Sequence, residues 1–156
     1  LELLKGKVML DIDYKAEGKR AARSTARLLR KTKMERQSLF FLYDYRDAPA
    51  LHRMNKKIQF MMRAYNREDV DGIFNQGIEV PVIHADAKFY SDSLMGVIRG
   101  KGIRLWMNAL GKYDTMEKTE TNSGFDALLQ MRHTNIIQTD LYKELIDYLK
   151  VRGVHR

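Results

Sequence analysis

The segment from Val8 to Lys15 carries the clearest chemistry in this sequence of 156 residues. It reads Val-Met-Leu-Asp-Ile-Asp-Tyr-Lys, and this alternation predicts a β-strand with apolar side chains on one face. The other face would carry Asp11, Asp13 and Lys15. A carboxylate such as Asp13 can hold a hard divalent cation, and the Lys15 ammonium can neutralise charge that develops on a phosphoryl oxygen. From the alternation alone, a structural Asp13–Lys15 pair or an exposed edge strand explains the pattern equally well.

Weaker chemical signals stand at the ends of later predicted strands. Each has an ordinary structural role open to it: a single histidine is more often a packing residue than an acid, a base or a ligand, and an aspartate before a helix is more often its cap. No HExxH, GxSxG or similar catalytic motif is present. The residues concerned are Arg63, Tyr65, His84, Asp86, Trp106, Asn108, Thr139 and Asp140.

Short apolar segments alternate with helical segments along the whole chain. Because no hairpin signal appears, the alternation predicts an α/β fold with a parallel sheet. The absence of GxGxxG and GxxxxGK[ST] makes a nucleotide-binding open sheet less favoured. The connection 109–123 is polar and is predicted to be a long loop after a strand. Strands are predicted at residues 8–14, 38–45, 58–64, 80–84, 103–108 and 135–139, and helices at residues 17–33, 49–54, 67–76, 92–99, 124–132 and 141 to about 152.

The chain is strongly basic, with 28 Lys and Arg residues against 20 Asp and Glu residues and a net charge of +8. A basic balance favours anionic partners, including phosphate esters. Much of the excess lies between Lys15 and Arg36 and is interpreted as the solvated outer face of a helix. Nucleic acid is not an expected partner, because no aromatic side chains interleave with these basic residues. The interpretation of the chain as a nucleic-acid-binding domain would rest on its charge alone.

The length predicts a single domain over residues 1–156. No segment is apolar for long enough to predict a membrane span. The sequence has no cysteine, which excludes disulfides and thiolate metal sites. The compartment stays open, since a periplasmic or secreted location fits this composition and so does the cytoplasm.

Three segments resemble the glycerophosphodiester phosphodiesterase family. Residues 3–15, Leu-Leu-Lys-Gly-Lys-Val-Met-Leu-Asp-Ile-Asp-Tyr-Lys, resemble the family segment that usually reads kgkvllniEiK. Residues 105–108, Leu-Trp-Met-Asn, resemble the family's WtvN strand, and residues 136–140, Ile-Ile-Gln-Thr-Asp, are similar to its last strand, giiTD. Order and spacing agree, so the resemblance covers nearly the whole chain.

This resemblance implies a (βα)8 barrel of the TIM type, a bound Mg²⁺ or Ca²⁺, and hydrolysis of a small-molecule glycerophosphodiester to glycerol 3-phosphate and an alcohol. By position, Asp13 would be a metal ligand, Lys15 would contact the phosphate in the transition state, and Trp106 would line the glycerol side of the pocket. Further candidates for substrate contacts at strand ends are Asn108, Arg63 and His84.

The sequence also departs from the family pattern. Asp13 is shorter than the usual Glu, Tyr142 stands where Pro follows the TD step, and Tyr43-Asp44 replaces small or hydroxyl residues. The first two strands, which bring the HRG and ExD motifs, have no counterpart. We therefore predict an incomplete barrel of about six βα units, equivalent to strands three to eight, that is inactive alone because the family's catalytic His pair is missing.

The alternative is a non-catalytic remnant of such a barrel that binds phosphate esters or a partner chain. Six strands would leave two open edges, at residues 8–14 and 135–139. Because open edges recruit other strands, we expect them to be covered by the basic helix, by a second copy in a homo-oligomer, or by an N-terminal portion of the protein.

Overall fold

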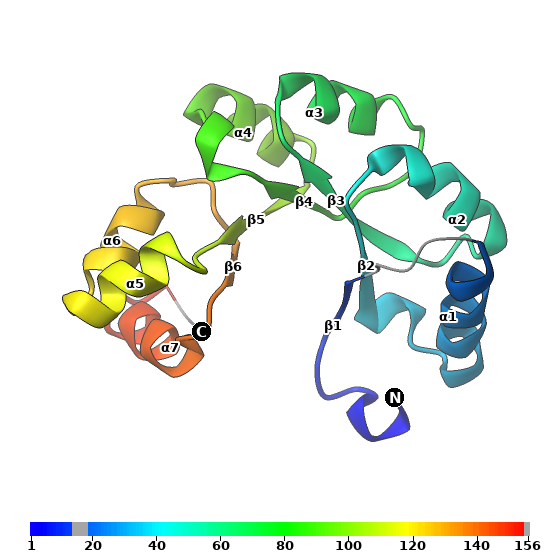
Figure 1. Ribbon diagram of the computed structural model, residues 1–156, viewed down its shortest axis with the longest axis horizontal. Coiled ribbons are helices and arrows are strands. Elements are labelled where there is room, and N and C mark those ends of the chain that lie inside the picture. The colour runs from blue at the N-terminus through cyan, green and yellow to red at the C-terminus, as the bar shows by residue number, and fades with distance from the viewer. Residues whose placement is uncertain (14–18, 155–156) are drawn as a thin grey trace. The chain divides into compact units, whose positions relative to one another are not determined.

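A computed structural model of the chain describes residues 1–13 and 19–154 (Figure 1). The described residues form two compact units, Leu1–His84 and Ala85–Arg156. Strands and helices alternate in both units, as the sequence pattern predicts. The single domain over residues 1–156 stays a prediction. No helix within the described ranges is both long and apolar enough to cross a membrane.

The first unit is built from strands that are followed by helices. Its strands lie close to the predicted positions, although the first begins at Leu10 and not at residue 8. Short 3-10 turns lie at Glu2–Leu4, Glu35–Gln37 and Tyr45–Asp47. The main elements are β1 (Leu10–Asp13), α1 (Lys19–Thr32), β2 (Ser38–Leu42), α2 (Ala48–Met54), β3 (Gln59–Ala64), α3 (Arg67–Phe74) and β4 (Val82–Ala85).

Parallel pairing sets which side chains of the first unit share a face. The strand order is the chain order, β1-β2-β3-β4. In the register, Asp13 pairs with Phe41, and Phe41 pairs with Met61. Paired residues in neighbouring strands point to the same side of a sheet, and residues two apart in a strand do so too. Asp13, Phe41 and Met61 therefore lie side by side on one face.

The opposite face of these strands is covered by helices and forms the core. Phe40 and Phe60 are fully buried there, with Met62 beside them. All five residues of β2 are buried, which is the continuous apolar pattern of a strand covered on both faces. β1 differs, because its Asp11 and Asp13 are exposed while Leu10 and Ile12 are half-buried.

The second unit contains two parallel strands and four helices among its described residues. Met107 of β5 pairs with Ile137 of β6. Helices α5, α6 and α7 lie together in Figure 1, and their buried contact includes Phe125 and Tyr148, whose ring centroids are 5.3 Å apart. The elements are α4 (Asp92–Gly100), β5 (Arg104–Asn108), α5 (Lys112–Thr119), α6 (Ser123–Leu129), β6 (Ile136–Gln138) and α7 (Tyr142–Val151), with a 3-10 turn at Ala87–Phe89.

The prediction of a long loop at residues 109–123 is wrong, because α5 occupies most of it. Its two buried positions are Asp114 and Glu117, so the face that packs inward is acidic. An apolar stripe is the signal by which a buried helix face is recognised, and this helix lacks one. Its polar sequence therefore reads as a loop.

The starts of α3 and α7 differ in their capping. Asn66 caps α3, where its Oδ1 accepts a hydrogen bond from the Asp69 amide at 2.9 Å, as such a residue before a helix should. The cap role considered for Asp140 is wrong. The N-cap of α7 is Leu141, which has no side-chain cap hydrogen bond.

The fold class is α/β of the TIM-barrel type, and six βα units are present where a full barrel has eight. The described strands confirm the predicted number and the predicted parallel pairing. The carboxyl ends of such strands are where this fold type holds its functional residues.

We predict that Gly124→Ala destabilises the second unit. A Cβ at Gly124 would lie 2.0 Å from the Tyr113 carbonyl oxygen and 2.8 Å from the Glu117 amide nitrogen, so α5 and α6 would have to move apart. The free energy of unfolding should fall by about 1–3 kcal/mol, the usual cost of overpacking. Urea denaturation measures this change.

The matched control is Gly100→Ala at the end of α4, where an added Cβ meets nothing within 4 Å. This substitution should leave stability unchanged or raise it by up to about 1 kcal/mol, because alanine has less conformational freedom to lose. Equal effects of the two substitutions would contradict the close packing of α5 against α6.

Candidate functional site

The carboxyl ends of β1 and β2 bring together an acidic and a phenolic side chain. Asp13 is the last residue of β1, and Tyr43 follows the last residue of β2. The Tyr43 hydroxyl donates a hydrogen bond to Asp13 Oδ1 over 3.1 Å. The Tyr43 ring packs edge-on against Phe41, with centroids 4.7 Å apart. This contact orients the Asp13 carboxylate at the functional end of the strands.

Asp11 lies two residues before Asp13 on the same face of β1. Desolvation, followed by the negative charge of Asp13, raises the pKa of the Asp11 carboxyl group above its ordinary value. The negative charge of Asp13 thus adds to the effect of burial on Asp11. A cation beside the two carboxylates would offset this charge.

The described residues do not form a metal site by themselves. Among them, no three His, Asp or Glu side chains gather closely enough to hold a metal ion. Asp13 with Asp11 offers one or two carboxylates, which matches the way in which Mg²⁺ is commonly bound, with water and substrate phosphate completing the shell. The residues thus fit a cation shared with a substrate and do not form a closed cage.

Lys15, predicted to contact the phosphate, lies outside the described residues. Two other predicted residues belong to the same unit as Asp13. His84 of β4 is only 5% exposed, and its ring centroid lies 5.5 Å from that of Phe41. Arg63 of β3 is two residues after Met61, so it shares the face of Phe41 and Asp13. Its guanidinium carbon lies 4.7 Å from the centroid of the Tyr65 ring.

Trp106 and Asn108 belong to the second unit, on one face of β5. The Trp106 indole N–H donates to Gln138 Oε1 of β6 at 3.4 Å. Asn108 Oδ1 accepts a hydrogen bond from the Leu110 amide at 2.7 Å. Asn108 therefore shapes the turn that follows its strand, which is a structural role. Contact of either residue with a substrate stays a prediction.

Asp114 organises the segment after β6, and sequence reasoning missed it. This aspartate is 3% exposed. Its Oδ1 accepts a hydrogen bond from the Thr139 hydroxyl at 2.6 Å, and its Oδ2 accepts one from the Asp140 amide at 2.9 Å. The Thr139–Asp140 step is thus held by a buried carboxylate of α5. No sequence signal marked this role, because the segment around Asp114 reads as a polar loop.

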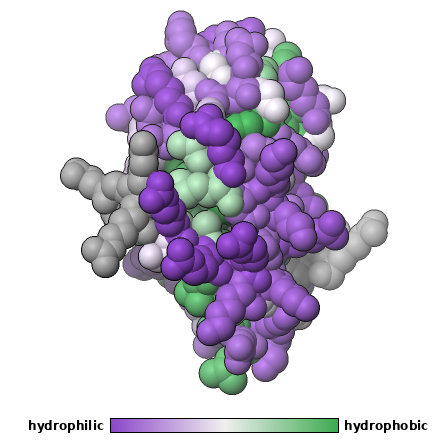
Figure 2. Space-filling view, turned by 90° about the vertical axis from the view of Figure 1, so that its right-hand side faces the viewer, coloured by the Kyte–Doolittle hydropathy of each residue, from purple (hydrophilic) through white to green (hydrophobic). Residues whose placement is uncertain are grey.

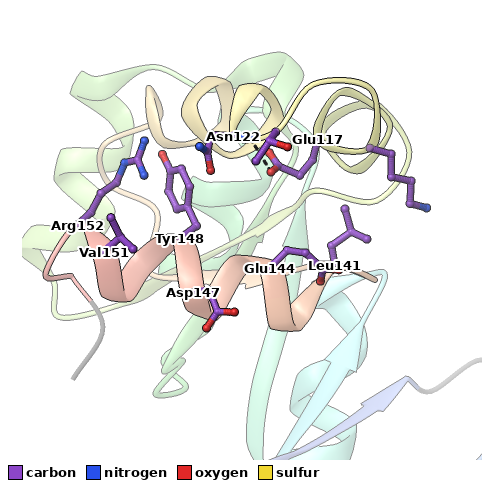
Figure 3. A pocket seen from close by; sticks show the side chains of 10 residues that line it. Glu117, Asn122, Leu141, Glu144, Asp147, Tyr148, Val151 and Arg152 are labelled. Atoms are coloured by element: carbon purple, nitrogen blue, oxygen red, sulfur yellow. Dashed lines mark hydrogen bonds between the residues drawn. The ribbon is translucent and has the colours of Figure 1, made fainter.

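A pocket lies between α7 and the α5–α6 connection (Figure 3). Its volume is about 510 Å³. On its α7 wall, the Tyr148 hydroxyl donates to Asp126, and the Arg152 guanidinium lies 3.7 Å from the Tyr148 ring centroid. On the opposite wall, Glu117 accepts hydrogen bonds from the amides of Asn122 and Phe125. These groups hold the helices together, so we assign the pocket walls a structural role.

Comparison with solved structures places the fold among known enzymes. A glycerophosphoryl diester phosphodiesterase from Parabacteroides distasonis matches 95% of this chain with a TM-score of 0.77 and 18% sequence identity. A glycerophosphodiester phosphodiesterase from the same organism matches 97% of the chain with a TM-score of 0.64 and 13% identity. The chain has the fold of the glycerophosphodiester phosphodiesterases. The predicted resemblance to these phosphodiesterases is therefore confirmed at the level of the fold.

The chain spans 52% of the first of these phosphodiesterase structures and 61% of the second. No protein family model matches the sequence. No curated protein matches it either. The likeness to glycerophosphodiester phosphodiesterases is thus carried by the arrangement of βα units rather than by overall identity.

We predict that Asp114→Ala lowers the free energy of unfolding by about 2–4 kcal/mol, because it leaves the Thr139 hydroxyl and the Asp140 amide without an acceptor at a buried position. Urea denaturation tests this. The control is Asp147→Ala on α7, an exposed aspartate 4.0 Å from the Lys150 ammonium, which should change stability by less than about 0.5 kcal/mol. If Asp114→Ala lowered the free energy of unfolding as little as Asp147→Ala, the proposed role of Asp114 would be contradicted.

A further prediction concerns the pH dependence of stability. Burial and the hydrogen bond to Asp126 raise the pKa of Tyr148 from 10.0 to about 12. The folded state therefore holds this proton more tightly than the unfolded state, so the stabilisation is complete below pH 10 and is lost as the pH rises toward 12.

Tyr148→Phe should reduce this alkaline loss of unfolding free energy, measured by urea denaturation across that pH range. Tyr142→Phe is the control, because Tyr142 is 60% exposed. It should leave the loss as it is in the parent chain. An unchanged pH profile for Tyr148→Phe would show that another group causes the loss.

Proposed function

We propose that this chain provides part of a phosphodiesterase site that hydrolyses glycerophosphodiesters to glycerol 3-phosphate and an alcohol. The observation that carries the proposal is the position of Asp13. It ends β1 at the functional end of the strands, in a fold shared with glycerophosphodiester phosphodiesterases. The neighbouring Asp11 and the Tyr43 hydroxyl give Asp13 the surroundings of a ligand-binding carboxylate.

We further propose that Asp13 holds a divalent cation, Mg²⁺ or Ca²⁺. When bound, such a cation supplies charge stabilisation at phosphoryl oxygens. The Tyr43 hydroxyl occupies Asp13 Oδ1 and thereby fixes the direction of the carboxylate. The raised pKa of Asp11 supports a cation at this position, because a positive charge offsets the repulsion between the two carboxylates.

Charge on the substrate phosphate would be met by Lys15 and by Arg63. Lys15 follows Asp13 by two residues in the sequence. Arg63 lies on the same face as Asp13, and its guanidinium is directed over the Tyr65 ring, which limits its freedom. Trp106 and Asn108 are proposed to line the substrate side.

Proton transfer is proposed to need residues beyond those of this chain. His84 is buried and packs against Phe41, so it is suited to a packing role and not to exchanging protons with a substrate. The chain also spans only about half to three-fifths of the phosphodiesterases whose fold it shares. We therefore propose that this chain alone does not turn over glycerophosphodiesters.

The competing proposal is a binding protein without catalysis. The departures of Asp13 and Asp44 from the family pattern leave room for it. The two proposals differ in one property. A phosphodiesterase site should bind its substrate more tightly when a divalent cation is present, whereas a simple binding site should not.

Completion of the sheet is a further part of the proposal. β1 pairs with β2 and β6 pairs with β5, and neither has another neighbour among the described strands. Unpaired strand edges bind further strands. We propose that these edges are covered by a second copy of the chain or by an N-terminal portion of the protein.

We predict that Mg²⁺ or Ca²⁺ strengthens the binding of glycerophosphocholine to the parent chain and that Asp13→Asn removes this effect. The loss of affinity in the presence of cation should be about tenfold, equivalent to about 1.4 kcal/mol. Isothermal titration calorimetry with and without the cation measures it. No product should form during the experiment.

The control is Asp71→Asn on α3, an exposed aspartate whose Oδ2 lies 3.3 Å from the Arg67 Nε. It should retain the cation effect. Cation dependence that survives in Asp13→Asn would remove Asp13 from the site, and robust turnover of glycerophosphocholine by the purified chain would refute its inactivity.

A further inference from the structure

Three arginines of α1 line one small pocket on the first unit. Arg23, Arg27 and Arg30 are exposed and stand four and three residues apart, which places them along one side of the helix. The pocket has a volume of about 190 Å³ and is completed by Ala26 and by Met54 at the end of α2. Figure 2 looks at the molecule from the side on which α1 lies in Figure 1, and most of that face is hydrophilic.

The charge of these arginines is not balanced within the described residues. The ion pairs and hydrogen bonds found there leave all three guanidinium groups without a carboxylate partner. The helix sequence Lys19–Thr32 contains no acidic residue. Like charges three or four residues apart on a helix repel. An anion in the pocket would relieve this repulsion between the arginines.

The chemistry of the pocket selects a phosphate group. Guanidinium groups present paired N–H donors that match phosphate oxygens and keep their charge at any physiological pH. A volume of about 190 Å³ admits one compact phosphate ester. Ala26 and Met54 give the pocket an apolar side, against which the carbon portion of an ester can lie.

Larger anionic partners fit this surface less well. Single-stranded nucleic acid is bound by basic grooves with aromatic side chains on which bases stack, and α1 has no aromatic residue. A helix that binds membranes presents a row of large apolar residues. In α1 the only large apolar side chain that is exposed is Leu28, while Leu29, Ala22 and Ala26 are buried within the unit.

We propose that the pocket formed by Arg23, Arg27, Arg30, Ala26 and Met54 binds the phosphate group of a small phosphorylated molecule. This site lies on helix side chains and does not include Asp13, so it is separate from the proposed phosphodiesterase site. On this proposal, the basic face of α1 binds a specific class of ligand and is not only a solvated surface.

The test is a titration of the full chain with inorganic phosphate and with glycerol 3-phosphate at constant ionic strength. Binding is followed by the NMR signals of the arginine side-chain N–H groups and by calorimetry. We expect saturable binding that shifts the signals of Arg23, Arg27 and Arg30. The triple variant Arg23→Gln, Arg27→Gln, Arg30→Gln should bind at least about tenfold more weakly. Glutamine keeps a high helix propensity, so α1 should persist.

The matched control removes the same charge elsewhere, by Lys118→Gln, Lys143→Gln and Lys150→Gln, three exposed lysines of the second unit. It should retain phosphate binding. Equal weakening in both triple variants would show that net charge alone attracts phosphate and would overturn the proposal. Unshifted signals of the α1 arginines at saturation would overturn it too.

Two further competition experiments distinguish a small phosphorylated molecule from a membrane surface and from a nucleic acid. Phosphate binding should be displaced poorly by vesicles containing phosphatidylglycerol and by single-stranded RNA. The proposal would be overturned if the vesicles or the RNA bound tightly and soluble phosphate did not displace them. The partner that bound would then be the preferred one. Asp13→Asn should leave the shifts of the α1 arginines intact, so failure of the phosphodiesterase proposal and failure of this one are distinguishable.

Discussion

Parallel pairing between strands determines where almost every side chain of interest lies. In a parallel sheet the carboxyl ends of neighbouring strands meet at one edge, and partners in the register point to the same face. The pairing of Asp13 with Phe41 and of Phe41 with Met61 thereby gathers residues that are far apart in sequence. Tyr43 reaches Asp13 only because β2 lies beside β1 in this register. The same pairing turns Phe40 and Phe60 to the opposite face, which is covered by helices. Successive residues of one strand therefore belong alternately to the helix-covered core and to the face of the candidate site.

Buried carboxylates stabilise the second unit in a way that apolar packing alone does not. Asp114 accepts hydrogen bonds from the Thr139 hydroxyl and the Asp140 amide, and Glu117 accepts them from the amides that begin α6. Buried polar groups of this kind are costly unless they are satisfied, and satisfied ones favour a single arrangement. The segment after β6 owes its shape to Asp114, and Gly124 allows the close approach of α5 and α6 that makes these contacts possible.

The distribution of charge gives the two proposed phosphate sites different characters. At the end of β1, Asp11 and Asp13 place two carboxylates side by side, so the proposed site would need a cation before a phosphate ester could bind. On α1, three guanidinium groups attract phosphate directly and have no acidic partner within the described residues. The two proposals therefore differ in that one site would depend on a cation and the other would not.

The sequence by itself determined the α/β class and the six βα units, because strand alternation and helix periodicity are local properties of the chain. Residues predicted to lie at strand ends, such as Arg63 and Asn108, were found there for the same reason. The absence of hairpin signals indicated the parallel pairing. The likeness to glycerophosphodiester phosphodiesterases came from three short segments that resemble the family's motifs. Only the tertiary structure decided the roles that depend on distant partners. Asp114 lies in a segment that reads as a loop, yet it binds residues 25 and 26 positions away, and Asn108 is occupied by its own turn. A side chain's type and local pattern are written in the sequence, whereas its burial and its hydrogen-bond partners exist only once separate elements have packed together.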